Sequence, residues 1–400
     1  QYPMQLNLPE AGHTVVYGAP GSGKTTFLQT LVLSAALSYS PQEVILYLLD
    51  FGGGSLNLFR SLPHVGAVAR DSEEERVNKI CRLVSEELGR RKELFAEQGI
   101  VSIDAYRQAA GSRMPYLLLV VDNFGPVLNL YPDLDEFFQL LTREGGSYGI
   151  YLVATASAEN AVPYRIAQNI TGGIALRMPD RGDYASIVGR TEGLEPENLP
   201  GRGLCKGKPP LEFQTALPAA GGETERAAGI RQLAELMDQK WEGERPKGIP
   251  VMPGRVTARG WKGSGLLAGL DRETVKPIEY DLKERQFLMI SGGGSPQGKR
   301  LLCALTAQAA ERFEKDGLIL YDPDEEILAK YKAQAGEYIT APEGFDRCVA
   351  GLMPILQKRK EQAAAPQGSA WLADQPELLL VISDHRRCFE AASNETMRRL

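Results

Sequence analysis

The strongest constraint on this chain is a glycine-rich stretch at residues 18–25, which reads Gly-Ala-Pro-Gly-Ser-Gly-Lys-Thr. It follows a short apolar run at residues 13–17 and opens a segment, residues 25–38, in which apolar side chains recur at helical spacing. A phosphate-binding loop (P-loop) has this spacing between a strand and a helix. Its glycines let backbone N–H groups converge on phosphate, and the helix N-terminus adds partial positive charge. The stretch therefore predicts a nucleoside triphosphate site; the alternative is a strand-to-helix turn that binds nothing.

Each part of this loop has a predicted role. The Lys24 ammonium is expected to reach the β- and γ-phosphates, and the Thr25 hydroxyl is expected to ligate Mg²⁺. ATP and Mg²⁺ are the predicted cofactors. The residues predicted to contact them are Gly18, Ala19, Pro20, Gly21, Ser22, Gly23, Lys24, Thr25 and Thr26.

A carboxylate downstream completes the predicted site. Asp122 comes directly after the apolar run 117–121, where a P-loop fold places the group that holds the metal's water shell, although a strand-terminal aspartate can also cap a helix. The next residue is Asn123, where many NTPases carry a glutamate that polarises the attacking water. Because an amide cannot accept a proton from water, the site is expected to bind ATP and hydrolyse it slowly. The predicted catalytic residues are Lys24, Asp122 and Asn123, and the predicted metal ligands are Thr25 and Asp122.

Other polar residues have both a functional and a structural interpretation. Thr155 and Ser157 follow the apolar run 150–154 and are candidates for a sensor of the γ-phosphate, but hydrogen bonding to the local backbone explains them equally well. Three arginines could reach the site of a neighbouring subunit: Arg143, Arg165 and Arg177. For each one taken singly, a surface or structural role is the better explanation.

Apolar runs alternate with helical patterns over the first half of the chain. The runs at residues 44–49, 117–121 and 150–154 lack the polar alternation of a half-exposed sheet, and residues 73–98 form a long amphipathic pattern of helical period. Strands that are apolar on both faces predict a parallel central sheet covered by helices on both faces. We therefore predict an α/β fold.

The same pattern starts again in the second half. Residues 287–290 are predicted to form a strand, followed by a second glycine-rich loop and a helix at residues 300–315, and the run 378–382 repeats the run 117–121 almost letter for letter. These repeats predict two P-loop modules in tandem, the second of them incomplete. The predicted domains are residues 1–242 for the first module, residues 243–258 for a linker rich in proline and glycine, and residues 259–400 for the second module.

The second glycine-rich loop departs from the motif. Arg300 stands where Ser or Thr should hold Mg²⁺, and Ser383 falls in the register of Asp122, with Asp384 one residue later. Because a cation at the metal position repels Mg²⁺, three alternatives stay open: an empty loop, a nucleotide bound without the usual metal, or an active site. The residues predicted to contact a nucleotide there are Gly294, Ser295, Pro296, Gln297, Gly298, Lys299 and Arg300.

Composition limits the range of partners and compartments. The chain has 45 basic and 51 acidic residues, a net charge of −6, which argues against a protein whose main work is gripping nucleic acid phosphates, although a local basic stripe stays open. Residues 90–92, Arg-Arg-Lys, are interpreted as a solvated helix face, with a DNA contact as the alternative. Five scattered cysteines point to reduced thiols in the cytosol. Because the chain begins at Gln1, we expect it to be part of a longer protein, with any membrane anchor outside it.

Several stretches together carry a family resemblance. They are Leu8-Pro-Glu-Ala-Gly-His13, the loop at 18–25, Tyr39-Ser-Pro41, Leu49-Asp-Phe-Gly-Gly-Gly54, Leu62-Pro-His-Val-Gly66, Arg90-Arg-Lys92, Arg143-Glu-Gly-Gly-Ser-Tyr-Gly149, Asp183-Tyr184 and Gly201-Arg-Gly203. The sequence resembles the FtsK/SpoIIIE-type ATPases, and within them the EssC/EccC motors of type VII (ESX-type) secretion systems. The likeness covers most of residues 6–215 and is weaker from residue 260 onward.

This resemblance implies a RecA/FtsK-like fold in a membrane-anchored chain with several cytoplasmic ATPase modules, of which these would be the second and third. It implies that small helical-hairpin substrates of the WXG type dock by a C-terminal signal on a later module. It also implies other secretion-system subunits as partners, and hexamers around a pore at the cytoplasmic face of the cell membrane. In such motors the first module is the competent ATPase, and later ones bind nucleotide or substrate and regulate. The departures at Asn123, Arg300 and Ser383 favour a regulatory or receptor role.

Three functions follow from these expectations. The first is a component of a protein secretion machine that binds ATP in its first module, with weak or no hydrolysis, and recognises substrate through its second. The alternative is a DNA translocase of the FtsK/SpoIIIE type, which requires a basic channel, a C-terminal winged helix and a catalytic glutamate. The third is a nucleotide-stabilised scaffold without turnover.

Overall fold

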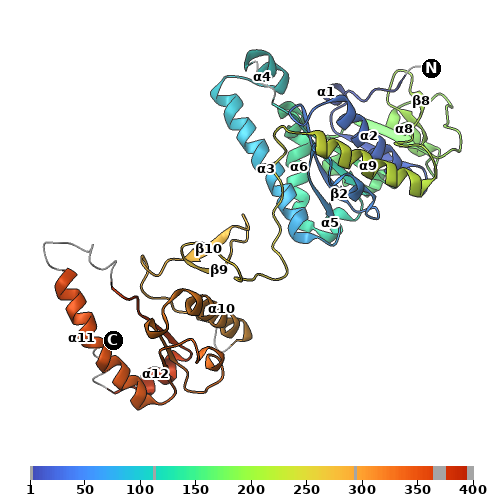
Figure 1. Ribbon diagram of the computed structural model, residues 1–400. Coiled ribbons are helices and arrows are strands. Elements are labelled where there is room, and N and C mark those ends of the chain that lie inside the picture. Colours follow the sequence, from blue (N-terminus) through green and yellow to red (C-terminus); the bar gives the residue numbers. More distant parts are fainter. Residues whose placement is uncertain (1–2, 111–113, 292–294, 364–374, 394–400) are drawn as a thin grey trace. The chain divides into compact units, whose positions relative to one another are not determined.

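The computed structural model describes residues 3–110, 114–291, 295–363 and 375–393, and the chain divides into two compact units, Gln1–Val251 and Met252–Leu400 (Figure 1). The division falls inside the segment 243–258. Over the described ranges, no helix combines the length and the apolar character that crossing a membrane requires.

The first unit is built on one eight-stranded sheet, with strand order β3-β2-β4-β5-β1-β6-β7-β8. The strands from β3 to β6 in this order run parallel, and β7 and β8 are antiparallel additions at one edge. The strands are β1 (Thr14–Tyr17), β2 (Val44–Asp50), β3 (Val65–Arg70), β4 (Tyr116–Asp122), β5 (Ile150–Ala156), β6 (Gly172–Leu176), β7 (Arg202–Cys205) and β8 (Leu211–Gln214). The predicted parallel sheet is confirmed.

Helices cover both faces of this sheet because its central strands are apolar on both sides. In β2, Tyr47 and Leu49 belong to the core on one face, and Leu46 and Leu48 belong to the core on the other. Helices α3, α6 and α8 pack on the first of these faces, and α2 and α9 pack on the second (Figure 1). The helices are α1 (Leu8–Ala11), α2 (Lys24–Ser38), α3 (Glu74–Glu97), α4 (Ile103–Ala110), α5 (Val127–Leu130), α6 (Asp135–Glu144), α7 (Tyr164–Ala167), α8 (Gly182–Val188) and α9 (Glu223–Lys240).

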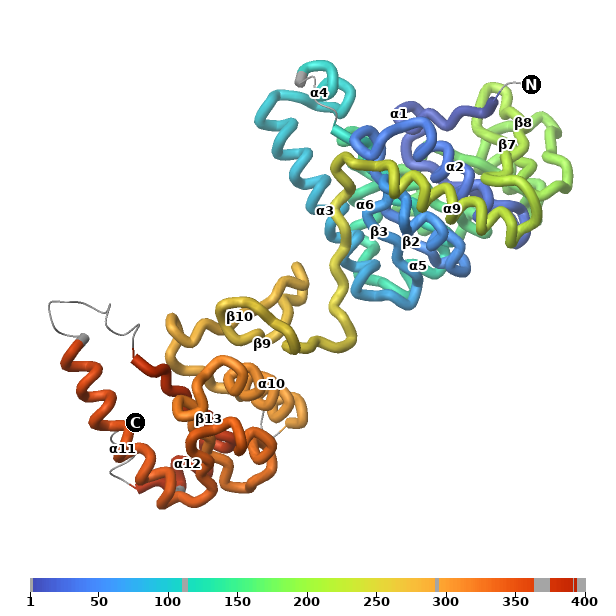
Figure 2. The backbone as a smooth tube through the Cα atoms, in the orientation of Figure 1, coloured from blue at the N-terminus to red at the C-terminus, as the bar shows by residue number. Residues whose placement is uncertain are grey.

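The segment after α9 packs on the first unit. The buried Tyr47 hydroxyl donates a hydrogen bond to the carbonyl of Lys247 (2.7 Å), and the Lys79 ammonium donates one to the carbonyl of Pro250 (2.9 Å). Ile249 packs against the apolar core. Figure 2 shows this part of the chain leaving α9 and running past α3. Residues 243–251, the docked segment, are therefore held by the sheet and by α3.

The second unit repeats half of the first. Its three-stranded parallel sheet has the order β12-β11-β13, which corresponds to β3-β2-β4, and β9 and β10 form an antiparallel pair. Asp322 follows β11 as Asp50 ends β2, and each carboxylate accepts a hydrogen bond from the backbone N–H six residues later. The elements are β9 (Leu266–Leu270), β10 (Pro277–Tyr280), α10 (Pro296–Arg312), β11 (Leu318–Tyr321), β12 (Glu337–Ile339), α11 (Pro342–Ala363), β13 (Leu379–Ile382) and α12 (His385–Ala391).

The strand predicted at residues 287–290 is wrong. This segment carries no strand pairing, and its Phe287 side chain is 79% exposed. In the first unit the corresponding strand, β1, lies between β5 and β6. The described part of the second unit has no strands in those two places, so the apolar residues 287–290 have no neighbouring strand to pair with.

The interpretation of residues 90–92 as a solvated helix face is wrong for Arg91, which is fully buried. Its guanidinium donates hydrogen bonds to the carbonyls of Tyr148 (2.7 Å) and Pro115 (2.8 Å) and pairs with Glu87 (2.7 Å). These carbonyls belong to the segments that lead into β5 and β4. Arg91 therefore ties α3 to the start of the two central strands.

We predict that Arg91→Met destabilises the first unit by about 3 kcal/mol, because it leaves the buried carbonyls of Tyr148 and Pro115 without a donor and removes one of the two arginines that pair with Glu87. The matched control is Arg90→Met: Arg90 also pairs with Glu87 but is exposed, so its loss costs less than about 1 kcal/mol. Urea unfolding of both variants measures the difference. Equal losses would contradict the role assigned to Arg91.

Candidate nucleotide-binding site

The predicted phosphate-binding loop joins β1 to α2 at the carboxyl edge of the sheet. Gly21 and Gly23 adopt φ values of +74° and +102°, which side chains with a Cβ rarely tolerate. A Cβ on Gly23 would also lie 2.7 Å from the backbone nitrogen of Gly201. Both glycines are therefore required by the backbone path of the loop.

Neighbouring strand ends hold this loop in place. The N–H of Gly18 donates to the carbonyl of Ala156 at the end of β5 (3.1 Å), and the N–H of Ala19 donates to the carbonyl of Arg177 after β6 (2.8 Å). The Arg177 guanidinium returns a hydrogen bond to the carbonyl of Pro20 (3.0 Å). Past these anchors, Lys24, Thr25 and Thr26 form the first turn of α2, whose N–H groups have no acceptor within the helix. A phosphate is a suitable acceptor for them.

Lys24 lies over the loop. Its ammonium donates hydrogen bonds to the carbonyls of Gly18 (2.6 Å) and Ala19 (3.1 Å). Burial lowers the pKa of Lys24, and the charge of Asp122 opposes this effect. The loop carbonyls are neutral acceptors, so a charged phosphate oxygen would be the stronger partner for this ammonium.

Asp122 lies at the centre of the site and is 1% exposed. One carboxylate oxygen accepts from the Thr25 hydroxyl (2.8 Å), and the other accepts from the Thr155 hydroxyl (2.7 Å). Burial raises the pKa of Asp122, and these two hydrogen bonds oppose the rise. A hydroxyl and a carboxylate in contact fit the hard oxygen ligands that Mg²⁺ takes next to a triphosphate.

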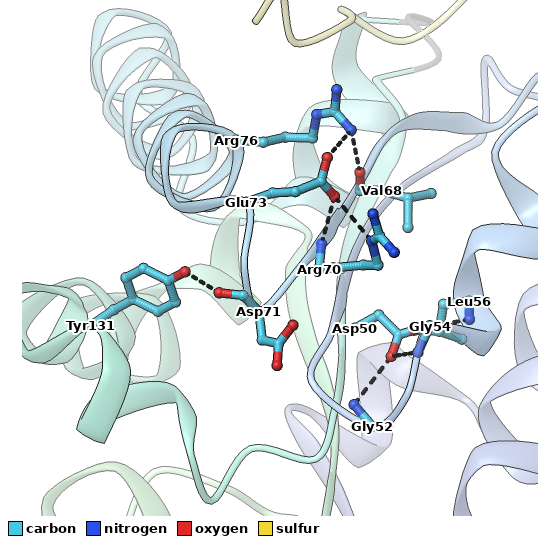
Figure 3. Close-up of polar contacts among 10 residues, drawn as sticks. All are labelled: Asp50, Gly52, Gly54, Leu56, Val68, Arg70, Asp71, Glu73, Arg76 and Tyr131. Carbon is cyan, nitrogen blue, oxygen red and sulfur yellow. Dashed lines mark hydrogen bonds and ion pairs between the residues drawn. The ribbon is translucent and has the colours of Figure 1, made fainter.

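A second carboxylate shapes the floor of the site. Asp50 stands opposite Asp122 in the β2–β4 register, and its oxygens accept from the N–H groups of Gly52 (3.1 Å), Gly54 (2.9 Å) and Leu56 (2.6 Å). Figure 3 shows the loop folded around Asp50 in this way. A Cβ on Gly52 would lie 2.4 Å from a carboxylate oxygen of Asp122. Glycine at this position therefore lets the loop pass beside Asp122.

Asn123 has the left-handed φ of +65°, a conformation that asparagine tolerates better than most residues. Its side-chain amide donates to the carbonyl of Phe51 (3.1 Å), and its backbone N–H donates to the Thr155 hydroxyl (2.7 Å). Asn123 thus brings an amide, and no carboxylate, next to Asp122.

The structure separates the two candidate sensors. Thr155 is fully buried and bonded to both Asp122 and Asn123, whereas Ser157 is exposed. Thr155 therefore orients Asp122, a role that the sequence alone did not reveal because it depends on which strand lies beside β4. Of the three arginines, Arg177 alone contacts the loop, and Arg143 and Arg165 pair with Glu144 and Asp135.

The second glycine-rich loop has a different geometry. Gly294 lies outside the described residues. Helix α10 begins at Pro296, three motif positions earlier than α2, which begins at Lys24. Gln297, Gly298, Lys299 and Arg300 are therefore helical, and Ser295 is the N-cap.

Comparison with known proteins gives a family match for the first unit. Residues 1–193 match the model of the FtsK/SpoIIIE family. The chain is also 30% identical to the ESX secretion system protein EccC of Thermomonospora curvata, over 98% of this chain and 31% of that protein. The chain spans less than a third of the length of the curated relatives it matches first.

Solved structures share the fold over most of the chain. EssC (ATPases 2 and 3) from Geobacillus thermodenitrificans is 26% identical, with a TM-score of 0.77, over 88% of this chain and 70% of that one. Thermomonospora curvata EccC (ATPases 2 and 3) in complex with a signal sequence peptide is 28% identical, with a TM-score of 0.60, over 99% of this chain and 74% of that one. The α/β P-loop ATPase fold is confirmed by these matches.

We predict that Thr155→Val weakens Mg²⁺-dependent ATP binding by about tenfold, because Asp122 loses a hydrogen bond to its charged form. The same loss raises the pKa of Asp122 further. Since a metal ligand must be ionised, the acid-side midpoint of Mg²⁺–ATP binding moves to higher pH. Titrations over the acidic range measure the shift, and Thr155→Ser, which keeps the hydroxyl, serves as the control. An unshifted midpoint in Thr155→Val would contradict this role.

Proposed function

Residues 1–193 match the model of the FtsK/SpoIIIE family, and on this premise we propose that the chain is the ATP-binding part of a type VII protein secretion motor. One observation carries the nucleotide part of the proposal: the Thr25 hydroxyl at the start of α2 and the Asp122 carboxylate at the end of β4 are 2.8 Å apart. Residues 97 positions apart in the sequence thus form a Mg²⁺ ligand set beside a phosphate-binding loop.

The proposed division of labour at this site follows from the contacts. Lys24, which donates to the carbonyls of Gly18 and Ala19 in the structure, would instead donate to the β- and γ-phosphates of a bound ATP. The backbone N–H groups in the first turn of α2 would donate to the same phosphates. Thr25 and Asp122 would hold Mg²⁺, which would supply positive charge to the phosphates. Asn123 would not act as a general base, since its amide cannot take a proton from water. We therefore propose a site that binds ATP tightly and turns it over slowly.

The proposed partners come from the relatives. The EccC structure of Thermomonospora curvata holds a signal sequence peptide, so we propose that this chain recognises a C-terminal signal of a small helical-hairpin (WXG-type) substrate. We further propose that the chain works at the cytoplasmic face of a membrane as part of a homo-hexamer, with other secretion-system subunits. The membrane anchor would lie outside this sequence.

We predict slow ATP turnover by the native chain and an increase of about 10- to 100-fold in kcat for Asn123→Glu, because the new carboxylate supplies a general base. Asn123→Gln is the matched control. Glutamine has the same side-chain length as glutamate and the same backbone cost at this left-handed position, but it supplies no base. Steady-state phosphate release measures all three proteins. Brisk turnover by the native chain, with no gain in Asn123→Glu, would place the base elsewhere.

A binding experiment separates secretion from DNA translocation. We expect a peptide with the C-terminal signal of a WXG-type substrate to bind the chain in fluorescence anisotropy, with an affinity that changes when Mg²⁺–ATP is added. We expect no shift of duplex DNA in gels at low salt, because a net charge of −6 offers little to phosphates. DNA binding without peptide binding would favour the translocase alternative.

A further inference from the structure

A pocket of the first unit lies at the edge of the sheet opposite the glycine-rich loop. It is lined by the residues that end and follow α8 and by the turn at residues 206–210, between β7 and β8. Its volume of about 660 Å³ falls within the range of about 300–1,000 Å³ common for ligand pockets. We call it the amino-edge pocket.

Strand pairing fixes the position of this pocket. Strand β7 runs antiparallel to β6, and its last residue, Cys205, lies opposite Ile174, so β7 ends beside the first half of β6. Helix α8 ends there too, because a Cβ on Gly173 would lie 2.5 Å from the carbonyl oxygen of Ile187. The glycine-rich loop instead leaves the carboxyl end of β1, which is paired in parallel with β6. The amino-edge pocket is therefore separate from the nucleotide site.

Three cations and one carboxylate line the pocket, namely Arg190, Lys206, Lys208 and Glu192. All four residues are exposed. The Lys206 ammonium donates a hydrogen bond to the carbonyl of Thr171 (3.1 Å). The side chains of Arg190 and Lys208 form no hydrogen bond or ion pair with any residue that the structure describes. The pocket thus carries a positive charge that its own walls do not balance, in a chain whose net charge is −6.

The carboxylates that follow the pocket in the sequence are engaged elsewhere. Glu195 pairs with Arg181, just before α8 (3.1 Å). Glu197 and Glu212 pair with Arg202, at the start of β7 (3.3 and 3.7 Å). Arginines of the same region therefore have acidic partners, whereas Arg190 and Lys208 in the pocket are left for a ligand.

Apolar surface accompanies these charges. Val188 and Pro210 are buried in the wall of the pocket, and Leu211, directly after the turn, is 60% exposed. Because Glu192 stands among the cations, a compact polyphosphate would meet its repulsion. An extended peptide can place separate carboxylates on separate cations and an apolar side chain against Leu211.

We propose that the amino-edge pocket binds an acidic, extended peptide segment of a partner protein, whose carboxylates pair with Arg190 and Lys208. Since the cations are exposed, salt screens the interaction and weakens it. This proposal is independent of the proposed function, because it involves neither ATP nor a C-terminal signal. Its test is carried out without nucleotide.

Fluorescence anisotropy of a labelled peptide of alternating glutamate and leucine, mixed with the whole chain, tests the proposal. A peptide of alternating glutamine and leucine is the matched control, since it keeps the shape and lacks the charge. We expect the acidic peptide to bind more tightly than the control, with an affinity that falls as salt is raised.

Variants of the chain locate the binding. Arg190→Glu and Lys208→Glu are each expected to weaken binding of the acidic peptide by about fivefold, because one ion pair is lost and a repulsion is added. Arg231→Glu, at an exposed position of α9, makes the same change in net charge away from the pocket and is expected to change the affinity by less than about twofold. Glu192→Gln is expected to strengthen binding, because it removes the repulsion inside the pocket.

Several results would overturn the proposal: no binding of the acidic peptide, equal binding of the acidic and glutamine peptides, or native affinity in both Arg190→Glu and Lys208→Glu. Binding of single-stranded DNA that depends on these two residues, without binding of the acidic peptide, would assign the pocket to nucleic acid phosphates instead. Unchanged urea unfolding of the variants shows that any loss of binding comes from the pocket.

Discussion

The site depends on one buried carboxylate, Asp122, which is held by two hydroxyl groups from different elements. Thr25 comes from α2 and Thr155 comes from β5, so the position of Asp122 fixes the loop, the helix and the neighbouring strand relative to one another. Burial favours the neutral form of this carboxyl group, and the two hydrogen bonds favour its charged form. The fold thus offsets the burial of this carboxyl group by surrounding it with hydrogen-bond donors.

The two units share a framework and differ in the residues of their glycine-rich loops. The strand order, the capping aspartate and the buried leucine are common to both, because they serve the packing of the sheet. The residues that differ lie in the glycine-rich loop and in the loop after the central strand. Glycine gives way to proline and acid there, and threonine gives way to arginine. The residues that pack the sheet are therefore the same in both units, whereas the residues of the glycine-rich loops differ.

Sequence patterns predicted what is periodic and local. The phosphate-binding loop, the parallel sheet and helix α3 followed from glycine spacing and apolar repeats, since these features are set by nearby residues. The sequence could not show which of Thr155 and Ser157 contacts Asp122, because that contact depends on which strand pairs with β4. It also missed the burial of Arg91, whose carbonyl partners are 24 and 57 positions away. The prediction of a strand at residues 287–290 was wrong because a strand needs a neighbouring strand to pair with as well as apolar residues.

The docked segment at residues 243–251 has a consequence for communication between the modules. The proline and glycine residues of this region predict a linker. The structure shows instead that side chains of Tyr47 and Lys79 hydrogen-bond to the chain as far as Pro250. The connection between the units is thereby shortened, and a shorter tether raises the effective concentration of one module around the other. Tyr47 is also three residues from Asp50 on the same strand. A shift of the carboxyl end of β2 would therefore displace the Tyr47 side chain, whose hydroxyl holds the docked segment.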